Sequence, residues 1–342
     1  MQEEGIKMER DFVSVIILNY NGRKFLKDCL DTISNQSVDN YEIILVDNNS
    51  TDGSVEFVKA NYPHVKVIEC KENYGFAKGN NIGVTYAKGR YIILLNNDTK
   101  VKPNYVEALY KTIKQREDYG LVGTTTLIGD KGFTSRSTLN VIGYWIPKVF
   151  KKDIEIFGGP GYSLIFDRKK VPIPFDDDYF IYNEDVYLAW LIRLKGYNAT
   201  HTLESPVWHY GSGTMGSRSK FMIFHGEKNR LMNLLIFYEG RTFIKLFPLF
   251  LLSMVFVPIR AFILYGSNCY LDAYVKAYWW VLRNFGIIMD KRKKIQTQRK
   301  VRDEEIFKYM SYKLSGDNIG KFINLFAKLY CKIVGVRTYD MQ

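Results

Sequence analysis

The sequence has few cysteines, and their spacing does not suggest a framework. Cys29, Cys70, Cys269 and Cys331 stand far apart in 342 residues. They form neither a CxxC pair nor the dense set found in disulfide-stapled domains. Disulfides and a zinc site built on thiolates are therefore disfavoured, and a reducing compartment is favoured.

The chain begins without an apolar stretch, and the phosphate-binding motifs of two large enzyme classes are missing. Its first twelve residues, MQEEGIKMERDF, mix both charge signs, whereas a secretory signal needs an apolar core. We therefore expect the protein in the cytoplasm. Neither GxGxxG nor GxxxxGK[ST] follows the first predicted strand, which disfavours a dinucleotide-binding fold and an NTPase.

The composition is that of a folded, basic protein. With 46% hydrophobic and 25% charged residues, the chain can bury one large core or two modest ones. Its formal net charge of +12 indicates an anionic partner, which could be nucleic acid, anionic lipid or a phosphorylated substrate. The excess lies mainly near the C-terminus, where residues 291–302 contain seven bases and no acid.

The N-terminal half alternates predicted strands and helices. Short β-branched runs with nearly continuous apolar character indicate strands that are covered on both faces. These runs are Val13–Leu18, Glu42–Val46, Val65–Glu69 and Tyr91–Leu95. Between the first two, one face at helical spacing carries Phe25, Leu26, Cys29, Leu30 and Ile33. This order predicts an α/β fold with a mostly parallel sheet.

Polar loops follow three of these predicted strands. They read Asn19-Tyr20-Asn21-Gly22, Asp47-Asn48-Asn49-Ser50 and Asn96-Asn97-Asp98. Any one loop could be no more than a turn or a helix cap. Ligands of such sheets bind at the carboxyl ends of the strands, however, so three polar loops at one edge predict a ligand site. Without a glycine-rich cradle, a metal ion held by a carboxylate would compensate a diphosphate.

Taken in order, these segments resemble a known family. VSVIILNYNG, IILVDNNSTDGS, NYGFAKGNNIG and YIILLNND are similar to family 2 glycosyltransferases of the GT-A fold. GYSLIF, FDDDYFIYNED and VWHYGSG resemble the acceptor side of the rhamnosyltransferase-like branch. The resemblance covers roughly residues 13–235. It implies a Rossmann-like, mostly parallel sheet flanked by helices, and transfer of a sugar from a nucleotide-diphosphate donor.

The resemblance also implies a metal site. Asp98 ends an apolar strand where a carboxylate can hold a divalent cation against the diphosphate, and His209 would supply a second ligand. Asn96 stands where the family often has an acid, so Asp98 is the single carboxylate of its motif. An oxygen and imidazole pair favours Mn²⁺ over Mg²⁺. Taken without the family, His209 fits a core histidine better.

The acid pair Glu184-Asp185 opens a predicted helix. Acids at a helix start are commonly caps and partners of the helix dipole. By resemblance Asp185 is the general base that takes the proton of the acceptor hydroxyl, and Glu184 orients the acceptor or its loop. Tyr187 and Leu191 depart from the family pattern, which leaves the acceptor open.

A further set of residues is expected near the nucleotide and the sugar. Asp47 is expected to bind the nucleobase or ribose. The others are Asn19, Tyr20, Asn21, Asn49, Asn73, Gly75, Phe76, Lys78, Gly79, Asn80, Asn96 and Asn97. Gly75 and Gly79 could equally serve the geometry of a helix entry.

The composition changes after Gly240. Residues 246–259 carry no charge, but this run is shorter than the roughly 18–20 residues of a membrane span. Because Pro248 and Pro258 disfavour one straight helix, we expect a re-entrant or interfacial segment, with a true span as the alternative. Aromatic residues follow, as expected at headgroup level, and the basic run comes next. They are Tyr265, Tyr270, Tyr274, Tyr278, Trp279 and Trp280. The alternative is a soluble helical domain with a solvated basic tail.

These observations predict two regions. Residues 1–240 form the catalytic domain, with a nucleotide-binding half at about 11–125 and an acceptor half at about 126–240. Residues 241–342 form a helical region at the cytoplasmic face of the cell membrane. The expected partners are a nucleotide-diphosphate sugar, a glycan or lipid-linked acceptor and an anionic membrane surface, without nucleic acid. An oligomer is compatible with the sequence.

Two other functions stay open at this stage. A sugar-nucleotide nucleotidyltransferase would need a glycine-rich basic loop after its first strand, where only Gly22 and Arg23 stand. A catalytically weak membrane scaffold would explain the degenerate motif at Asn96. The donor is a dTDP-rhamnose or a uridine-diphosphate sugar.

Overall fold

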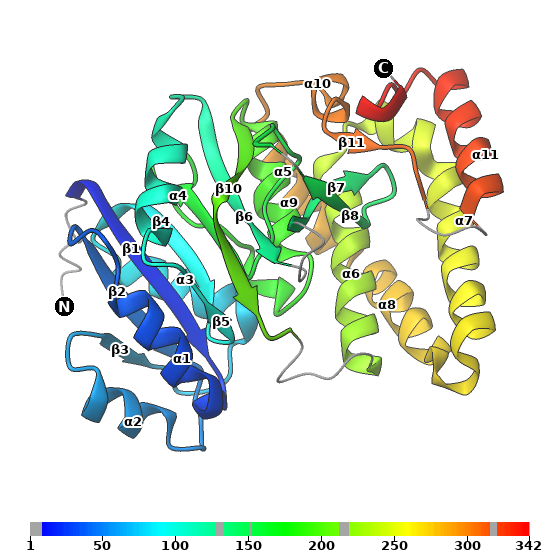
Figure 1. Cartoon of the computed structure of the whole chain (residues 1–342). Coiled ribbons are helices and arrows are strands. Elements are labelled where there is room, and N and C mark those ends of the chain that lie inside the picture. Colours follow the sequence, from blue (N-terminus) through cyan, green and yellow to red (C-terminus); the bar gives the residue numbers. More distant parts are fainter. Residues whose placement is uncertain (1–8, 128–132, 151, 212–218, 315–319, 342) are drawn as a thin grey trace. The chain divides into compact units, whose positions relative to one another are not determined.

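The computed structural model describes residues 9–127, 133–150, 152–211, 219–314 and 320–341. The chain forms two compact units (Figure 1). The first comprises Met1–Ser135, Lys148–Ile192 and Tyr197–Gly216, and the second Arg136–Pro147, Arg193–Gly196 and Ser217–Gln342. They divide the chain at points other than the predicted boundary at residue 240. The first eight residues and the end of the VWHYGSG motif lie outside the described residues.

The first unit is built on a mostly parallel sheet. Its strands are β1 (Glu9–Asn19), β2 (Tyr41–Asp47), β3 (Lys66–Glu69), β4 (Gly89–Asn96), β5 (Thr99–Lys100), β6 (Tyr119–Leu127), β9 (Ser163–Asp167) and β10 (Asn198–His209). β7 (Phe133–Asn140) begins in this unit, and β8 (Trp145–Phe150) ends in it. The helices are α1 (Arg23–Ser34), α2 (Ser54–Asn61), α3 (Gly75–Tyr86), α4 (Tyr105–Lys114) and α5 (Glu184–Leu194), with a 3-10 turn η2 (Asp177–Tyr179).

The strand pairing confirms the predicted parallel core. β1 pairs in parallel with β2 and β4, and β2 with β3. β9 runs antiparallel between β4 and β6, and β10 runs parallel to β6. Asn19 lies opposite Asp47, and Leu18 opposite Asn96, so the carboxyl ends of β1, β2 and β4 meet at one edge.

Helices pack closely on this sheet. On the predicted apolar face of α1, Phe25 is half-buried and the other four residues, Leu26, Cys29, Leu30 and Ile33, are fully buried. α3 approaches β1 directly, because a Cβ added at Gly79 or Gly83 would lie 2.5 Å from Leu18 or Ile16. Two glycines on one helix face therefore allow this approach, which fixes the start of α3 near the polar edge of the sheet.

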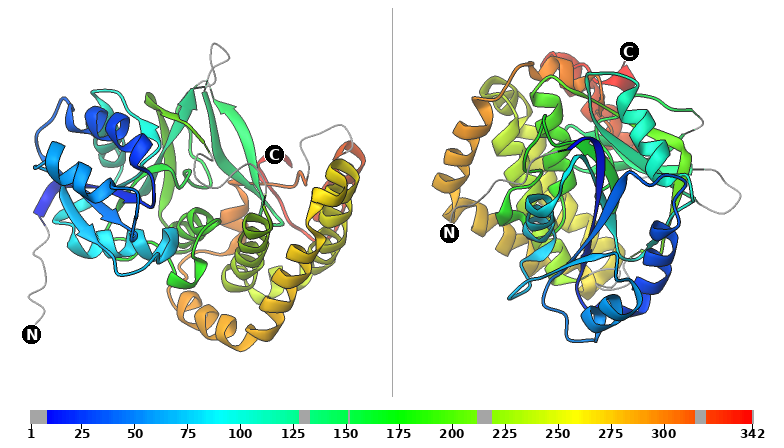
Figure 2. Two further views of the ribbon diagram at one scale, coloured as in Figure 1. Left: turned by 90° about the horizontal axis from the view of Figure 1, so that it is seen from below. Right: turned by 90° about the vertical axis from the view of Figure 1, so that its left-hand side faces the viewer.

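The second unit is mainly helical. It contains α6 (Lys220–Phe237), α7 (Gly240–Tyr265), α8 (Leu271–Arg283), α9 (Phe285–Gln296), α10 (Asp303–Phe307) and α11 (Gly320–Ile333). The short strand β11 (Met310–Ser311) pairs with the end of β7. α6 packs against α8 and α9, and α7 against α8; Figure 2 shows these long helices from two sides.

The expectation that prolines would interrupt the apolar segment is wrong. α7 runs unbroken over 26 residues with Pro248 and Pro258 inside it. Its length and composition alone are sufficient to cross a bilayer: its most apolar 18-residue window has a mean hydropathy of 2.2, and 33% of that window is buried inside the protein. The buried positions recur from Thr242 to Ala261, so packing along one face holds the helix together past both prolines.

The basic run is not simply a solvated stretch. Arg292 donates to the carbonyls of Leu235 and Tyr238. Gln296 donates to the carbonyls of Ile236 and Phe237, and Arg299 donates to Phe237 as well. The last carbonyls of α6 have no partner within their own helix, so these side chains cap it. Other cations of the run, including Lys293 and Lys294, are exposed.

The predicted aromatic belt is only partly at the surface. Trp279 and Tyr265 are exposed, but Tyr274 is buried. The hydroxyl of Tyr278 donates to the carbonyl of Met254 on α7, and Lys228 lies over the ring of Trp280. Tyr278 and Trp280 are half-buried and hold α8 against its neighbours.

A buried ion pair organises the second unit. Arg230 is 1% exposed and donates twice to one carboxylate oxygen of Glu227. It also donates to the carbonyl of Ile142 and lies against the ring of Tyr144, whose hydroxyl donates to Glu227. The buried charges therefore satisfy each other and join α6 to residues 142–144.

We predict that Arg230→Met lowers the free energy of unfolding by about 3–5 kcal/mol, because it leaves Glu227 buried without its cation. Chemical denaturation would measure the loss. The matched control is Lys308→Met, whose partner Glu305 is exposed and whose removal should cost less than about 1 kcal/mol. A double variant Glu227→Leu/Arg230→Met should recover most of the loss. Equal costs for the two single variants would contradict the prediction.

Candidate active site

Amide and carboxylate side chains link the three strand ends. The Asn97 amide donates to Asn19 Oδ1 at 2.7 Å, and Asn19 Nδ2 donates to Asp47 Oδ1 at 2.9 Å. The loops after β4, β1 and β2 are thus joined in one chain of hydrogen bonds. Their predicted convergence is confirmed by this contact.

Asp47 organises its own loop. It is 2% exposed, and its two oxygens accept from the hydroxyl and the backbone N–H of Ser50. Ser50 in turn accepts from the backbone N–H of Asn21, whose side-chain oxygen accepts from the N–H of Thr51. The predicted contact of Asp47 with a nucleobase or ribose stays a prediction, while its structural role is visible here.

Three residues of these loops form turns or lie at the surface. Asn21 and Asn49 have left-handed backbone conformations, with φ of 48° and 66°. Asparagine tolerates this region better than most residues. Tyr20, between Asn19 and Asn21, is 40% exposed. The turn interpretation therefore accounts for the backbone of both asparagines, and Tyr20 is free to contact a ligand.

The entrance of α3 lies beside the second loop. Asn48 Nδ2 donates to Asn73 Oδ1 at 3.2 Å and to the carbonyl of Gly75 at 2.9 Å. Gly75 has φ of +77°, and a Cβ there would lie 2.6 Å from the Phe180 carbonyl oxygen. Glycine is required at this position, and its neighbour Phe76 donates its N–H to the same carbonyl.

The other predicted residues of α3 have distinct surroundings. The Asn80 amide donates to the carbonyl of Phe76 within the helix. The Phe76 ring lies 6.1 Å from that of Phe175, and Lys78 Nζ lies 4.2 Å from the Tyr74 ring centroid. Asn80 therefore supports the helix, while Phe76 and Lys78 are half-buried at its entrance.

Asp98 and His209 lie side by side, as expected. His209 Nε2 is 3.2 Å from Asp98 Oδ1, and the backbone N–H of Tyr210 donates to the Asp98 carbonyl. β10 reaches this point because Trp208 and His209 pair with Lys100 and Thr99 of β5. His209 therefore reaches Asp98 because β10, which lies far later in the chain, pairs with β5.

The side chains of Asp98 and His209 are suitable ligands for a divalent cation. Asp98 is 7% exposed, and its Oδ1 accepts no hydrogen bond from the described residues. A buried carboxylate oxygen without a donor, facing an imidazole, suits Mn²⁺. No group of three or more His, Cys, Asp or Glu side chains is placed to hold a metal in the part of the chain that the structure describes. Remaining ligands would therefore come from a bound diphosphate or water.

Two consecutive residues, Gly161 and Tyr162, connect the acid pair to Asp98 and His209. The Tyr162 ring stacks on His209 with centroids 4.4 Å apart. The backbone N–H of Gly161 donates to Asp185 Oδ2 at 3.2 Å. A Cβ at Gly161 would lie 3.2 Å from the Asp185 Cβ and 3.4 Å from a Glu184 oxygen. Asp98, His209 and Asp185 thus belong to one connected site.

The two acids have different environments. Glu184 is 6% exposed, and burial, reinforced by the charge of Asp185, raises its pKa well above the usual value. Its Oε2 has no hydrogen-bond partner among the described residues. Asp185 is half-buried and accepts from the N–H of Gly161 and of Val186. Burial therefore favours the neutral form of Glu184, which stands beside a better solvated Asp185.

The loop before the acid pair is strained. Phe180, Tyr182 and Asn183 have φ of 56°, 69° and 62°. Positive φ is costly for aromatic residues, and such residues cluster at functional sites. The carbonyl of Phe180 accepts from the start of α3, so the loop that leads to the acid pair is also bonded to this helix.

Some site residues were not singled out from the sequence. Tyr162, Ser50, Asn48 and Gly161 carry contacts that hold the predicted residues in place. Tyr162 and Gly161 stand in the GYSLIF motif, but side-chain stacking on His209 requires the fold. Asn96 contributes its backbone, since its N–H donates to the Tyr162 carbonyl.

Comparisons with known proteins agree with this geometry. Residues 14–172 match the model for "Glycosyl transferase family 2". Glycosyltransferase GlyG of Streptococcus pneumoniae serotype 4 is 35% identical over 116 residues, which are 33% of this chain and 38% of that protein. The putative glycosyltransferase EpsH of Bacillus subtilis is 31% identical over 136 residues, 39% of each chain. The chain therefore spans about two fifths of the length of these relatives.

Solved structures show the same fold. S. aureus TarS 1-349 in complex with UDP has a TM-score of 0.51 at 13% identity, over 94% of this chain and 88% of that one. GalNAc-T7 with UDP, GalNAc and Mn²⁺ has a TM-score of 0.56 at 15% identity, over 84% of this chain and 58% of that one. The first unit has the GT-A fold, and residues 14–172 are similar to glycosyl transferase family 2.

Proposed function

We propose that this protein is an inverting glycosyltransferase that moves a sugar from a nucleotide-diphosphate donor to a glycan or lipid-linked acceptor. The carrying observation is the connected set of Asp98, His209 and Asp185, joined through Gly161 and Tyr162. Similar structures hold UDP, which favours a uridine-diphosphate sugar over dTDP-rhamnose. The acceptor would lie at the cytoplasmic face of a membrane, as the apolar helix α7 suggests.

Asp185 is the proposed base. Its carboxylate is held by the backbone N–H of Gly161 and of Val186. These contacts leave other lone pairs for the acceptor hydroxyl, since a carboxylate has about four. The hydroxyl oxygen attacks the anomeric carbon while its proton passes to Asp185, and the bond to the diphosphate breaks. Direct displacement inverts the configuration.

Glu184 has a supporting role. Burial and the charge of Asp185 favour its neutral form. In that form Glu184 adds no second negative charge beside the base and can donate a hydrogen bond. Two ionised carboxylates this close would oppose each other.

Asp98 and His209 would hold the cation. A bound Mn²⁺ or Mg²⁺ would neutralise the charge that develops on the departing diphosphate. Stacking of Tyr162 orients the His209 ring toward Asp98. The loops at Asn19, Asp47 and Asn97 form the edge beside which the nucleotide would lie.

We predict that Asp185→Asn reduces turnover by about 10²- to 10⁴-fold, the contribution of a general base, while donor affinity changes little. Initial rates and calorimetry with UDP would be compared. Asp178→Asn, from an exposed position on the preceding loop, is the control and should keep full turnover. Normal turnover in Asp185→Asn would refute the base assignment.

We predict that Asp98→Asn abolishes the dependence of UDP binding on Mn²⁺, because it removes the charged ligand. Calorimetry with and without Mn²⁺ would measure this. Asp31→Asn, on the surface of α1, should bind like the unaltered protein. Metal-independent binding in the unaltered protein would contradict the metal assignment. Absence of nucleotide binding even at millimolar concentration would favour a scaffold.

We predict that Glu184→Gln flattens the pH dependence of stability. Since the folded-state pKa is raised, the stability contributed by Glu184 is full below its unfolded pKa of about 4.3 and is lost as pH rises toward the folded value. The variant should therefore gain stability relative to the unaltered protein with rising pH, by up to about 1.4 kcal/mol per pH unit. Denaturation from pH 4 to 8 would measure it. Exposed Glu117→Gln is the control, and parallel curves would contradict the prediction.

A further inference from the structure

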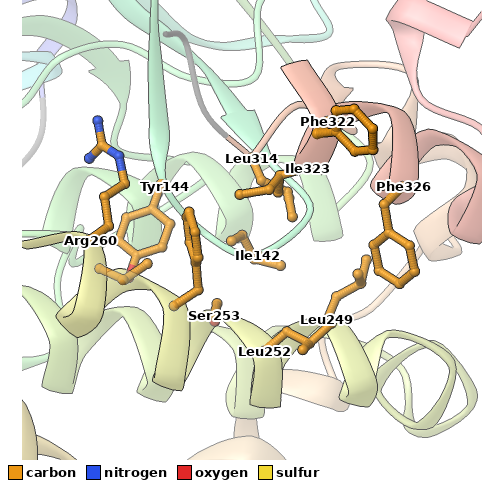
Figure 3. Close-up of a pocket in the computed structure, with 12 residues that line it drawn as sticks. Ile142, Tyr144, Leu249, Leu252, Ser253, Arg260, Leu314, Phe322, Ile323 and Phe326 are labelled. Atoms are coloured by element: carbon orange, nitrogen blue, oxygen red, sulfur yellow. The ribbon is translucent and has the colours of Figure 1, made fainter. Parts of the chain in front are cut away.

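The second unit contains an apolar cavity that the proposed chemistry does not use. Its volume is about 430 Å³, within the range of about 300–1,000 Å³ typical of ligand sites. Apolar side chains of α7 and α11, including Leu249, Leu252, Phe322 and Phe326, form much of its wall (Figure 3). Arg260 is the cation of its lining. Such a cavity suits a hydrocarbon chain that carries an anionic group.

The surface around the cavity is also apolar. On α11, Phe322 is 86% and Ile333 82% exposed, while Ala327 and Cys331 face inward. α7 exposes a row of large apolar side chains: Ile244, Phe247, Leu251, Leu252, Val255, Ile259, Phe262 and Ile263. The two helices are joined where the Tyr330 hydroxyl donates to the Lys245 carbonyl. We call the exposed apolar residues of α7 and α11 the apolar face. Its extent exceeds the scattered apolar residues of an ordinary soluble surface.

Charge decides what covers this face. Residues 241–342 contain 18 lysines and arginines but seven acids, so they carry +11 of the formal net charge of +12. α7 and α11 themselves contain Arg241, Lys245, Arg260, Lys321, Lys328 and Lys332 without an acid. Apolar side chains among cations match the anionic surface of a bilayer.

The packing of α7 defines how it would meet the membrane. Its buried residues recur along almost its whole length, from Thr242 through Phe250 to Ala261. A helix that crossed the bilayer would draw the elements packed along it into the hydrocarbon. α7 is therefore suited to lie in the interface, with its outer face toward the lipid.

We propose that the apolar face binds an anionic bilayer, and that the cavity takes one acyl chain of a phospholipid whose phosphate lies near Arg260. In Figure 3, Arg260 stands on the side of Tyr144, and Phe322 and Phe326 stand on the other side. This arrangement gives the lipid an apolar lining for its chain and a cation for its headgroup. The second unit would then bind the membrane in two ways: its apolar face would lie on the bilayer surface, and its cavity would hold one lipid.

Flotation of the full chain with vesicles tests the face. Binding should be strong to phosphatidylcholine with phosphatidylglycerol and weak to phosphatidylcholine alone. Phe322→Ser and Phe326→Ser should each lower partitioning by about tenfold, as expected for one lost buried phenylalanine. Ile173→Ser, at an exposed position of the first unit, should change nothing. Thermal unfolding checks that each variant is folded.

The cavity is tested with a phospholipid that carries a diazirine at the end of one acyl chain. Labelling should map to Leu249, Leu252 and Ile323. Ser253→Phe fills the cavity from a buried position outside the apolar face, so it should abolish the labelling while vesicle binding stays within about twofold. Arg260→Gln should reduce the preference for anionic vesicles by about fivefold. Equal binding to neutral and anionic vesicles, or labels outside the cavity, would overturn the proposal. So would a dimer in solution that Phe322→Ser dissociates, because a second copy would then cover the face.

Discussion

The contact between the Gly161–Tyr162 backbone and its surroundings joins the two halves of the site. Gly161 donates to Asp185, the Tyr162 carbonyl accepts from Asn96, and the Tyr162 ring stacks on His209. A Cβ at position 161 would lie tightly against the Asp185 Cβ, at 3.2 Å, and in contact with a Glu184 oxygen. Two adjacent residues thus set the spacing between the proposed base and the proposed cation ligands, which is the spacing over which sugar transfer would occur.

Residues near this contact have a backbone conformation that most residues avoid. Gly75, Phe180, Tyr182 and Asn183 all have positive φ. Two N–H groups at the start of α3 donate to the Phe180 carbonyl, and the packing of α3 on β1 through Gly79 holds that end in place. Strain in the loop is therefore balanced by hydrogen bonds and by close packing, as expected where a loop must present acids in one orientation.

The second unit uses its cations in two ways. Arg230, Arg292 and Arg299 are drawn inward, where they satisfy a buried carboxylate and the carbonyls at the end of α6. Other cations stand on α7, α9 and α11 near exposed apolar side chains. Buried arginines thus stabilise the helices of the second unit, and its exposed cations make the apolar surface basic. Arginine suits the inner role because its fork satisfies several acceptors at once.

The sequence could not reveal which members of a polar loop would face a ligand. Asn21, Asn49 and Asn80 have the composition of a binding loop, yet two of them support turns and the third bonds to its own helix. Asparagine serves both purposes because its amide binds backbone as readily as ligand. The prolines of α7 misled for a related reason, since their local cost is offset by packing along the helix.

By itself the sequence determined the parallel strands, the apolar face of α1, the polar strand ends and the resemblance to a family, because alternating apolar patterns and ordered motifs are local properties. Tertiary structure decided the partners: Tyr162 on His209, Gly161 on Asp185, the arginines on the end of α6, and the raised pKa of Glu184. These depend on which distant segments meet and on how much water they exclude, and neither quantity is encoded in the neighbours of a residue along the chain.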